Sequence, residues 1–178
     1  MAELKVNPSL FDKLTLNERV TEIVEEGSPV QMQDTGTTQL LLKSPSLIHR
    51  YNESAMRRSV RRELSWLLNT VNLAAVQDLE RYPHVQTSVL NYGMPDLTGR
   101  SSSERAIKAR SSEITEAIRT FEPRLDSDKL EVEAKPGIGL DNAVSYVIRG
   151  DIVAAVRAMP VQFLANIEVE TGQAVVRE

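Results

Sequence analysis

Apolar residues recur at helical spacing in the stretch of chain that begins at Ser54. At about 100° per residue, these positions fall within about a third of a helix circumference. The pattern therefore predicts an amphipathic helix with one buried stripe. The stripe consists of Met56, Val60, Leu64, Leu67, Leu68 and Val71. The flank and opposite face of the helix carry Arg57, Arg58, Arg61 and Arg62.

This basic face allows two interpretations. It can bind phosphate or an acidic protein surface, or it can be the solvated back of the helix. The one tryptophan of the chain, Trp66, projects away from the apolar stripe. Because large aromatic side chains are usually buried, we expect Trp66 to pack against a second element, with display to a partner as the alternative.

A second helix is predicted between two local signals. Ser101 and Glu104 have the spacing of a capping box, in which each satisfies a backbone N–H of the first turn. Pro123 disfavours the helical conformation of the residue before it, so the helix should end at Glu122. The expected buried stripe is Ile107, Ile114, Ala117, Ile118 and Phe121. Arg110 falls inside this stripe, so it must snorkel to solvent or find an acid.

The last third of the chain changes to a period of two, which is typical of strands. Alternating apolar residues predict strands over residues 130–135 and 144–148, and a third over 161–169. Thr171-Gly172 then turns the chain into a short last strand, residues 174–176. We expect an α+β fold, a small antiparallel sheet packed against two main helices, in a domain of residues 54–178.

Residues 1–53 are predicted to form an extended N-terminal arm. Prolines, glycines and a polar run from Gln31 to Gln39 interrupt any helical or strand period. One apolar motif, residues 9–15, stands out on this arm. It is either a first helical turn packed on its own domain or a hook for a partner. Its apolar members are Leu10, Phe11 and Leu14.

Composition narrows the possible chemistry. The 178 residues contain no cysteine and two histidines, which excludes disulfides and thiol catalysis and leaves little for metal ligation. We therefore expect no metal and no cofactor. The net charge of −4 argues against a general basic field, so we expect no nucleic acid partner.

Membrane and export signals are also missing from the pattern. No stretch approaches the roughly 18 consecutive apolar residues of a membrane helix. The first residues lack the charged-then-apolar order of a signal peptide. We therefore expect a cytoplasmic protein without direct membrane insertion.

The sharpest cluster of candidate residues is Glu122-Pro123-Arg124, at the junction of helix and sheet. The φ-locked proline holds the two charged side chains in a defined relation, so they can pair or each meet an opposite charge on a partner. A glycosidase acid must be protonated, whereas a nearby guanidinium favours the ionised carboxylate. The cluster therefore indicates a structural or interface role rather than catalysis.

Several short motifs, in this order along the chain, resemble the TssE family. TssE proteins are baseplate subunits of the bacterial type VI secretion system and belong to the wedge proteins of contractile phage tails. The motifs are residues 9–14 (SLFDKL), 59–64 (SVRREL), 67–70 (LLNT), 89–97 (VLNYGMPDL) and 121–125 (FEPRL).

The resemblance implies a structural baseplate subunit in the cytoplasm, at the baseplate docked to the inner membrane. It implies TssF, TssG and TssK as neighbours, the sheath proteins TssB and TssC assembling above, and contact with the VgrG spike hub. Glu122, Pro123 and Arg124 match the family's signature tripeptide, which is tied to assembly, and Tyr92 is a further interface candidate. Residues 28–53 depart from the family as a longer polar insertion.

The resemblance also suggests how such a subunit works. A free edge of the antiparallel sheet can template the first sheath ring by β-strand addition. Two other functions stay open at this point. An anti-adaptor that blocks a response regulator resembles the same fold, which would make this a regulatory binding module. The family also has a lysozyme-related label, which would make it a peptidoglycan hydrolase.

Overall fold

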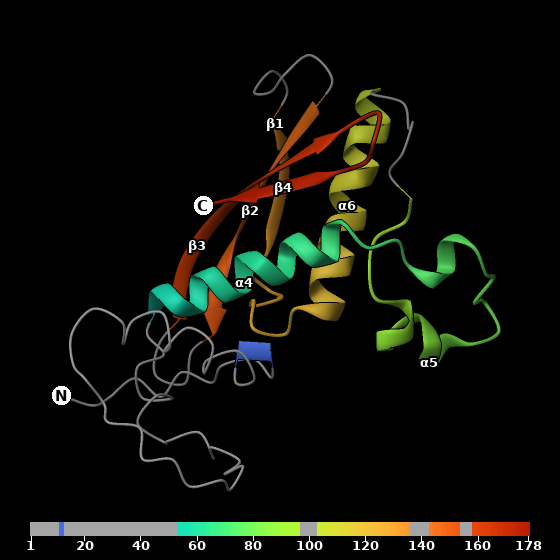
Figure 1. The fold of residues 1–178 in the computed structure, drawn as a ribbon, viewed down its shortest axis with the longest axis horizontal. Coiled ribbons are helices and arrows are strands. Elements are labelled where there is room, and N and C mark those ends of the chain that lie inside the picture. Colours follow the sequence, from blue (N-terminus) through green and yellow to red (C-terminus); the bar gives the residue numbers. More distant parts are fainter. Residues whose placement is uncertain (1–10, 13–52, 97–102, 136–142, 154–157) are drawn as a thin grey trace, which may run out of the picture. The chain divides into compact units, whose positions relative to one another are not determined.

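The computed structural model describes residues 11–12, 53–96, 103–135, 143–153 and 158–178 (Figure 1). The chain divides into two compact units, residues 1–59 and 60–178. Leu10, Leu14, Ser101 and the polar insertion 28–53, apart from Glu53, lie outside the described residues.

The larger unit contains a four-stranded antiparallel sheet in the order β1-β2-β3-β4, which confirms the predicted fold class. Figure 1 shows the strands side by side. Their bounds are β1 Glu131–Lys135, β2 Ala143–Val153, β3 Ala158–Glu168 and β4 Ala174–Arg177. β2 and β3 pair along their whole length, from Ala143 opposite Glu168 to Val153 opposite Ala158. β3 begins earlier than the predicted residue 161, because cross-strand pairing with β2 includes Pro160, a residue that does not favour a strand.

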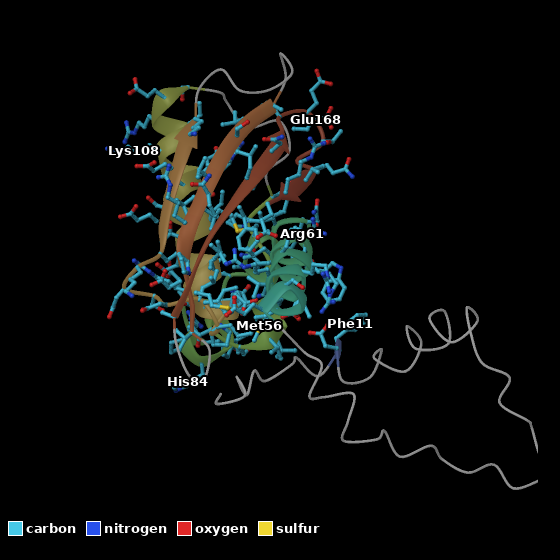
Figure 2. All side chains as sticks on the ribbon, turned by 90° about the vertical axis from the view of Figure 1, so that its left-hand side faces the viewer. Phe11, Met56, Arg61, His84, Lys108 and Glu168 are labelled. Carbon is cyan, nitrogen blue, oxygen red and sulfur yellow. The ribbon has the colours of Figure 1, made fainter. Side chains whose placement is uncertain are left out.

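The two main helices are α4 Glu53–Leu68 and α6 Glu104–Phe121. The predicted stripe of α4 is buried except for Val71, which is 57% exposed because the helix ends three residues earlier. In α6, Ile114, Ala117 and Ile118 are buried as predicted. α6 packs along β1, and its other side faces solvent, where Lys108 projects outward (Figure 2).

The two ends of α6 show how well local signals predict a helix. The C-cap is Glu122, as the following proline predicted. The predicted capping box is wrong, because α6 begins at Glu104 and its N-cap is Ser103, whose side chain accepts a hydrogen bond from the Ala106 N–H. Three consecutive serines precede Glu104, and any of them could cap a helix chemically, so spacing alone did not distinguish them.

Arg110 lies inside the core rather than at its rim. It is 3% exposed, so it does not snorkel to solvent. Its Nε and Nη2 atoms and the Tyr146 hydroxyl have no hydrogen-bond partner among the described residues. Burial raises the pKa of the Tyr146 hydroxyl, while the nearby positive charge of Arg110 opposes that rise. We expected an acidic residue to pair with Arg110. Within the described part of the chain, no acidic residue forms a hydrogen bond with its Nε or Nη2 atom.

The described part of the segment between the helices, residues 69–96, contains three short helices. They are η1 Leu73–Ala75, α5 Pro83–Gln86 and η2 Val89–Asn91. The buried Asn91 side chain holds them together, since it accepts a hydrogen bond from the Ala74 N–H at 2.8 Å and donates to the Gln86 carbonyl at 2.9 Å. No helix in the described ranges is both long and apolar enough to cross a membrane.

Gly93 returns this segment to the end of α4 through a tight backbone approach. Its φ is +126°, and the Met94 N–H donates to the Thr70 carbonyl at 2.7 Å. A Cβ atom at position 93 would lie 2.3 Å from that carbonyl oxygen. Only glycine therefore fits both the conformation and the space.

We predict that Gly93→Ala destabilises the domain by more than about 2 kcal/mol, because the new methyl group meets backbone atoms that cannot rotate away. Urea unfolding followed by circular dichroism measures the change. Gly150→Ala is the matched control, since its Cβ would lie at an ordinary 3.7 Å from a Leu130 methyl group. Equal stability of the two variants would contradict this account of Gly93.

Candidate functional site

The Glu122-Pro123-Arg124 tripeptide folds back on itself directly after α6. Glu122 caps the helix and donates its backbone N–H to the Ile118 carbonyl at 2.8 Å. Its side chain is buried, since the residue is 3% exposed. The Arg124 guanidinium binds both carboxylate oxygens of Glu122, with Nε donating at 2.7 Å and Nη2 at 2.5 Å. A two-pronged pair of this kind is the strongest form of charged hydrogen bonding.

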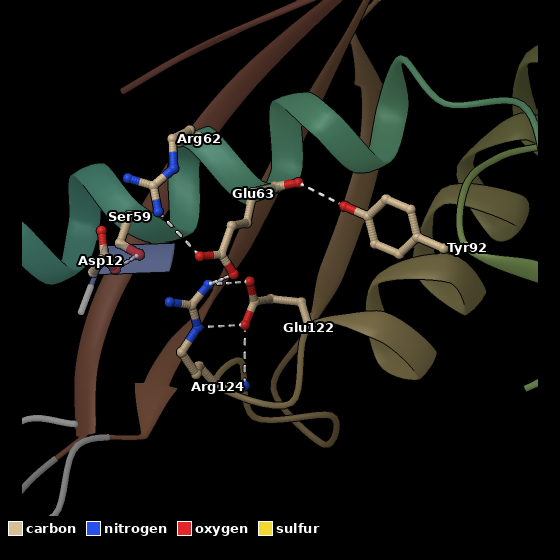
Figure 3. A network of polar contacts seen from close by, with 7 residues as sticks. All are labelled: Asp12, Ser59, Arg62, Glu63, Tyr92, Glu122 and Arg124. Atoms are coloured by element: carbon tan, nitrogen blue, oxygen red, sulfur yellow. Dashed lines mark hydrogen bonds and ion pairs between the residues drawn. The ribbon is translucent and has the colours of Figure 1, made fainter. Parts of the chain in front are cut away.

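The same guanidinium also binds a second acid, Glu63 of α4. Arg124 Nη2 donates to Glu63 Oε2 at 2.5 Å (Figure 3). The other Glu63 oxygen pairs with Arg62 Nη2 at 3.2 Å. One arginine therefore joins the end of α6 to the middle of α4. We call Glu63, Glu122 and Arg124 the arginine clamp.

Tyr92 fastens the connecting segment to the same place. Its hydroxyl donates to the Glu63 carbonyl at 3.3 Å, and its ring packs edge-on against Phe121 with centroids 5.4 Å apart. Burial raises the pKa of the Tyr92 hydroxyl, and the negative charges of Glu63 and Glu122 raise it further. The predicted candidates Tyr92, Glu122 and Arg124 thus lie together (Figure 3).

Glu63 is the member of this cluster that was not singled out from the sequence as a site residue. It lies between the arginine-rich face and the apolar stripe of α4, so its position resembles that of an ordinary surface acid. The signal that could have identified it is the presence of an acid directly after Arg61-Arg62, within a motif shared with the family.

The clamp is suited to holding elements together. Both Glu122 oxygens face Arg124, so neither is presented to a bound sugar as a general acid would be. Within the described ranges, no group of three or more His, Asp or Glu residues could hold a metal ion. The charges of the tripeptide bind each other and Glu63 inside the fold.

The basic face of α4 is only partly exposed. Arg58 and Arg61 are exposed, whereas Arg57 and Arg62 are half-buried. Figure 2 labels Arg61 on the helix. Arg62 also stacks over the Trp66 ring, with its guanidinium carbon 5.0 Å from the ring centroid. Trp66 is 43% exposed, so the expectation that it packs in the core is wrong.

Two residues of the N-terminal motif are described, and both belong to the smaller unit. Phe11 and Asp12 are helical, and Phe11 is 41% exposed. The buried Asp12 carboxylate accepts a hydrogen bond from the Ser59 hydroxyl at 2.6 Å. Asp12 is therefore anchored within its own unit.

The fold and the clamp define a structural domain, in which paired charges lock helices together around a small antiparallel sheet. The comparison with protein families identifies it further. The chain belongs to the baseplate wedge protein gp25 family, whose model matches residues 54–159. It therefore has a structural role of the phage baseplate wedge type. The comparisons with curated proteins and with solved structures gave no match.

We predict that Arg124→Ala destabilises the larger unit by about 3 kcal/mol, because it leaves the buried Glu122 carboxylate without its cation. Chemical unfolding measures the loss. Lys129→Ala is the matched control, since it removes an exposed ion pair with Asp151 at 2.6 Å and should leave the unfolding midpoint nearly unchanged. If the two variants unfold alike, the clamp does not hold the fold together.

We predict that Tyr92→Phe makes the stability of the protein less sensitive to alkaline pH. The raised pKa means that the folded state holds the phenolic proton more tightly than the unfolded state. This contribution is complete below the ordinary tyrosine pKa of about 10 and is lost as pH rises through the folded-state value. The unfolding free energies of wild type and variant should therefore converge above about pH 10. A constant difference between wild type and Tyr92→Phe would contradict the prediction.

Proposed function

We propose that this protein is a structural baseplate subunit of a type VI secretion system, where it links the wedge to the contractile sheath and helps to start sheath polymerisation. Membership of the baseplate wedge family supports the structural role. The single feature that carries the proposed link to the sheath is an unpaired stretch of sheet edge on β3.

β4 covers only part of β3. Its four residues pair with Leu164–Ile167, while β3 itself begins at Ala158. Among the described strands, none pairs with residues 158–163 on the β4 side. We call these six residues the β3 overhang. They lie in line with β4, so a partner's strand placed there would continue the sheet without disturbing it.

The ladder identifies which backbone groups the overhang offers. Glu168 donates its N–H to the Gln173 carbonyl, so the even-numbered residues of β3 face the β4 side. Within the overhang these are Ala158, Pro160 and Gln162. Pro160 has no N–H, so an added strand would receive hydrogen bonds from Ala158 and Gln162 only. This gap favours one register over its neighbours.

The side chains of the overhang have a matching pattern. Met159, Val161 and Phe163 are buried on the helix-covered face, whereas Ala158, Pro160 and Gln162 are exposed. A strand added here would therefore alternate apolar and polar residues in the same phase. The sheath proteins TssB and TssC are the proposed source of that strand.

The wedge proteins TssF and TssG, with TssK and the VgrG hub nearby, are proposed to bind elsewhere. The exposed Arg58 and Arg61 side chains suit an acidic surface on one of them. Leu10, Phe11 and Leu14 are the proposed contacts of the N-terminal arm. This assignment places the protein in the cytoplasm, at the baseplate docked to the inner membrane.

We predict that Gln162→Pro prevents sheath assembly while leaving the domain folded. Proline removes the outward N–H of residue 162 and breaks no backbone hydrogen bond to β2, although the bond that Arg149 donates to the Gln162 side chain is lost. Val161 before it is already extended. Fluorescent sheath subunits in a strain that lacks the gene, complemented with each variant, provide the measurement. Circular dichroism and thermal unfolding of the purified variant verify that it is folded.

Gln162→Ala is the matched control for this experiment. It also loses the bond that Arg149 Nε donates to the Gln162 side chain at 3.1 Å, but it keeps the backbone N–H. It should build sheaths as wild type does. Normal sheaths in the strain that lacks the gene would contradict the proposed function, whereas normal sheaths with a folded Gln162→Pro protein would contradict only the role of the overhang.

A further inference from the structure

Asn69, the first residue after α4, makes an unusual set of contacts. Its Nδ2 atom donates to the Ser65 carbonyl at 2.7 Å, within its own helix turn. The same amide group also reaches β4, more than a hundred residues away in sequence. Nδ2 donates to the Ala174 carbonyl at 2.8 Å, and Oδ1 accepts from the Ala174 N–H at 2.9 Å.

These two bonds lie on the outer edge of β4. Because Gln173 faces β3 through its carbonyl, Val175 and Arg177 also face β3. Ala174 and Val176 therefore direct their N–H and C=O groups away from the sheet. Asn69 binds both groups of Ala174, as the backbone of a neighbouring strand would.

We propose that Asn69 closes the outer edge of β4 and thereby confines strand addition to the β3 overhang. With Ala174 occupied, Val176 is the one residue within β4 whose outward groups remain for pairing among the described residues. A single residue gives at most two backbone hydrogen bonds, too few to hold an added strand against the entropy of ordering it. This inference rests on the proposed function, because it specifies which edge a sheath strand uses.

The chemistry of the side chain supports this role. A carboxamide has a donor and an acceptor in the arrangement of a peptide group, so it can satisfy both backbone groups of Ala174 at once. Capping the C-terminal end of α4 alone would require fewer hydrogen bonds than Asn69 makes. The adjacent Thr70 hydroxyl donates to the Trp66 carbonyl at 2.7 Å, in the same turn, by a bond that involves no residue of β4.

Closing an edge also prevents self-association of the protein. An open strand edge can pair with the same edge of a second copy. We therefore expect Asn69→Ala to self-associate through β4, with a sedimentation coefficient that rises with protein concentration, while wild type stays monomeric. The exchange rate of the Ala174 amide should increase by about tenfold or more, because its acceptor is gone.

Two further variants make the experiment specific. Thr70→Ala is the matched control, since it removes a comparable hydrogen bond from the same helix turn, and it should remain monomeric with a protected Ala174 amide. Adding Val176→Pro to Asn69→Ala removes the next outward N–H of β4 and should restore the monomer. Should Asn69→Ala fail to fold, Asn69→Thr keeps a hydroxyl for the Ser65 carbonyl and serves for the same two measurements.

The inference is overturned if the folded Asn69 variant stays monomeric, or if its Ala174 amide exchanges as slowly as in wild type. Both measurements use the purified protein and require no baseplate. Their failure would therefore leave the proposed function intact, while normal sheaths in the strain that lacks the gene would reject the proposed function and leave the closed edge of β4 standing.

Discussion

The larger unit depends on a buried charge that must be neutralised. Glu122 ends α6 inside the protein, where an unpaired carboxylate would be costly. Arg124, two residues further along the chain, pairs with this carboxylate and also with Glu63 on α4. The position of α4 relative to the end of α6 therefore depends on the two ion pairs of Arg124. Tyr92 adds the connecting segment to the same point.

This arrangement gives the signature tripeptide a physical meaning. Its charged groups are bound within the fold, so the tripeptide holds the end of α6 in place next to α4. Both ion pairs share the Arg124 guanidinium, so the end of α6 and the middle of α4 are joined through one side chain. Of the basic face, Arg58 and Arg61 are the exposed residues.

The two sheet edges differ in whether their outward backbone groups are available for pairing. The β3 overhang leaves backbone groups without a strand partner on the β4 side among the described strands, whereas Asn69 occupies the outward groups of Ala174 on β4. Under the proposed function this asymmetry confines strand pairing to one edge, because two open edges would allow pairing in the wrong place.

The sequence by itself determined the elements whose signals are local. The periodic stripe of α4, the stop at Pro123 and the alternation in the last third predicted two helices and an antiparallel sheet, because each pattern depends on neighbours within a few residues. Only the tertiary structure decided the role of Glu63, the exposure of Trp66 and the bond between Asn69 and Ala174. The partners of Glu63 and Asn69 are 61 and 105 residues away, and no local period records such a distance. Long-range hydrogen bonding appears only when the chain has folded, since it depends on where packing places each element.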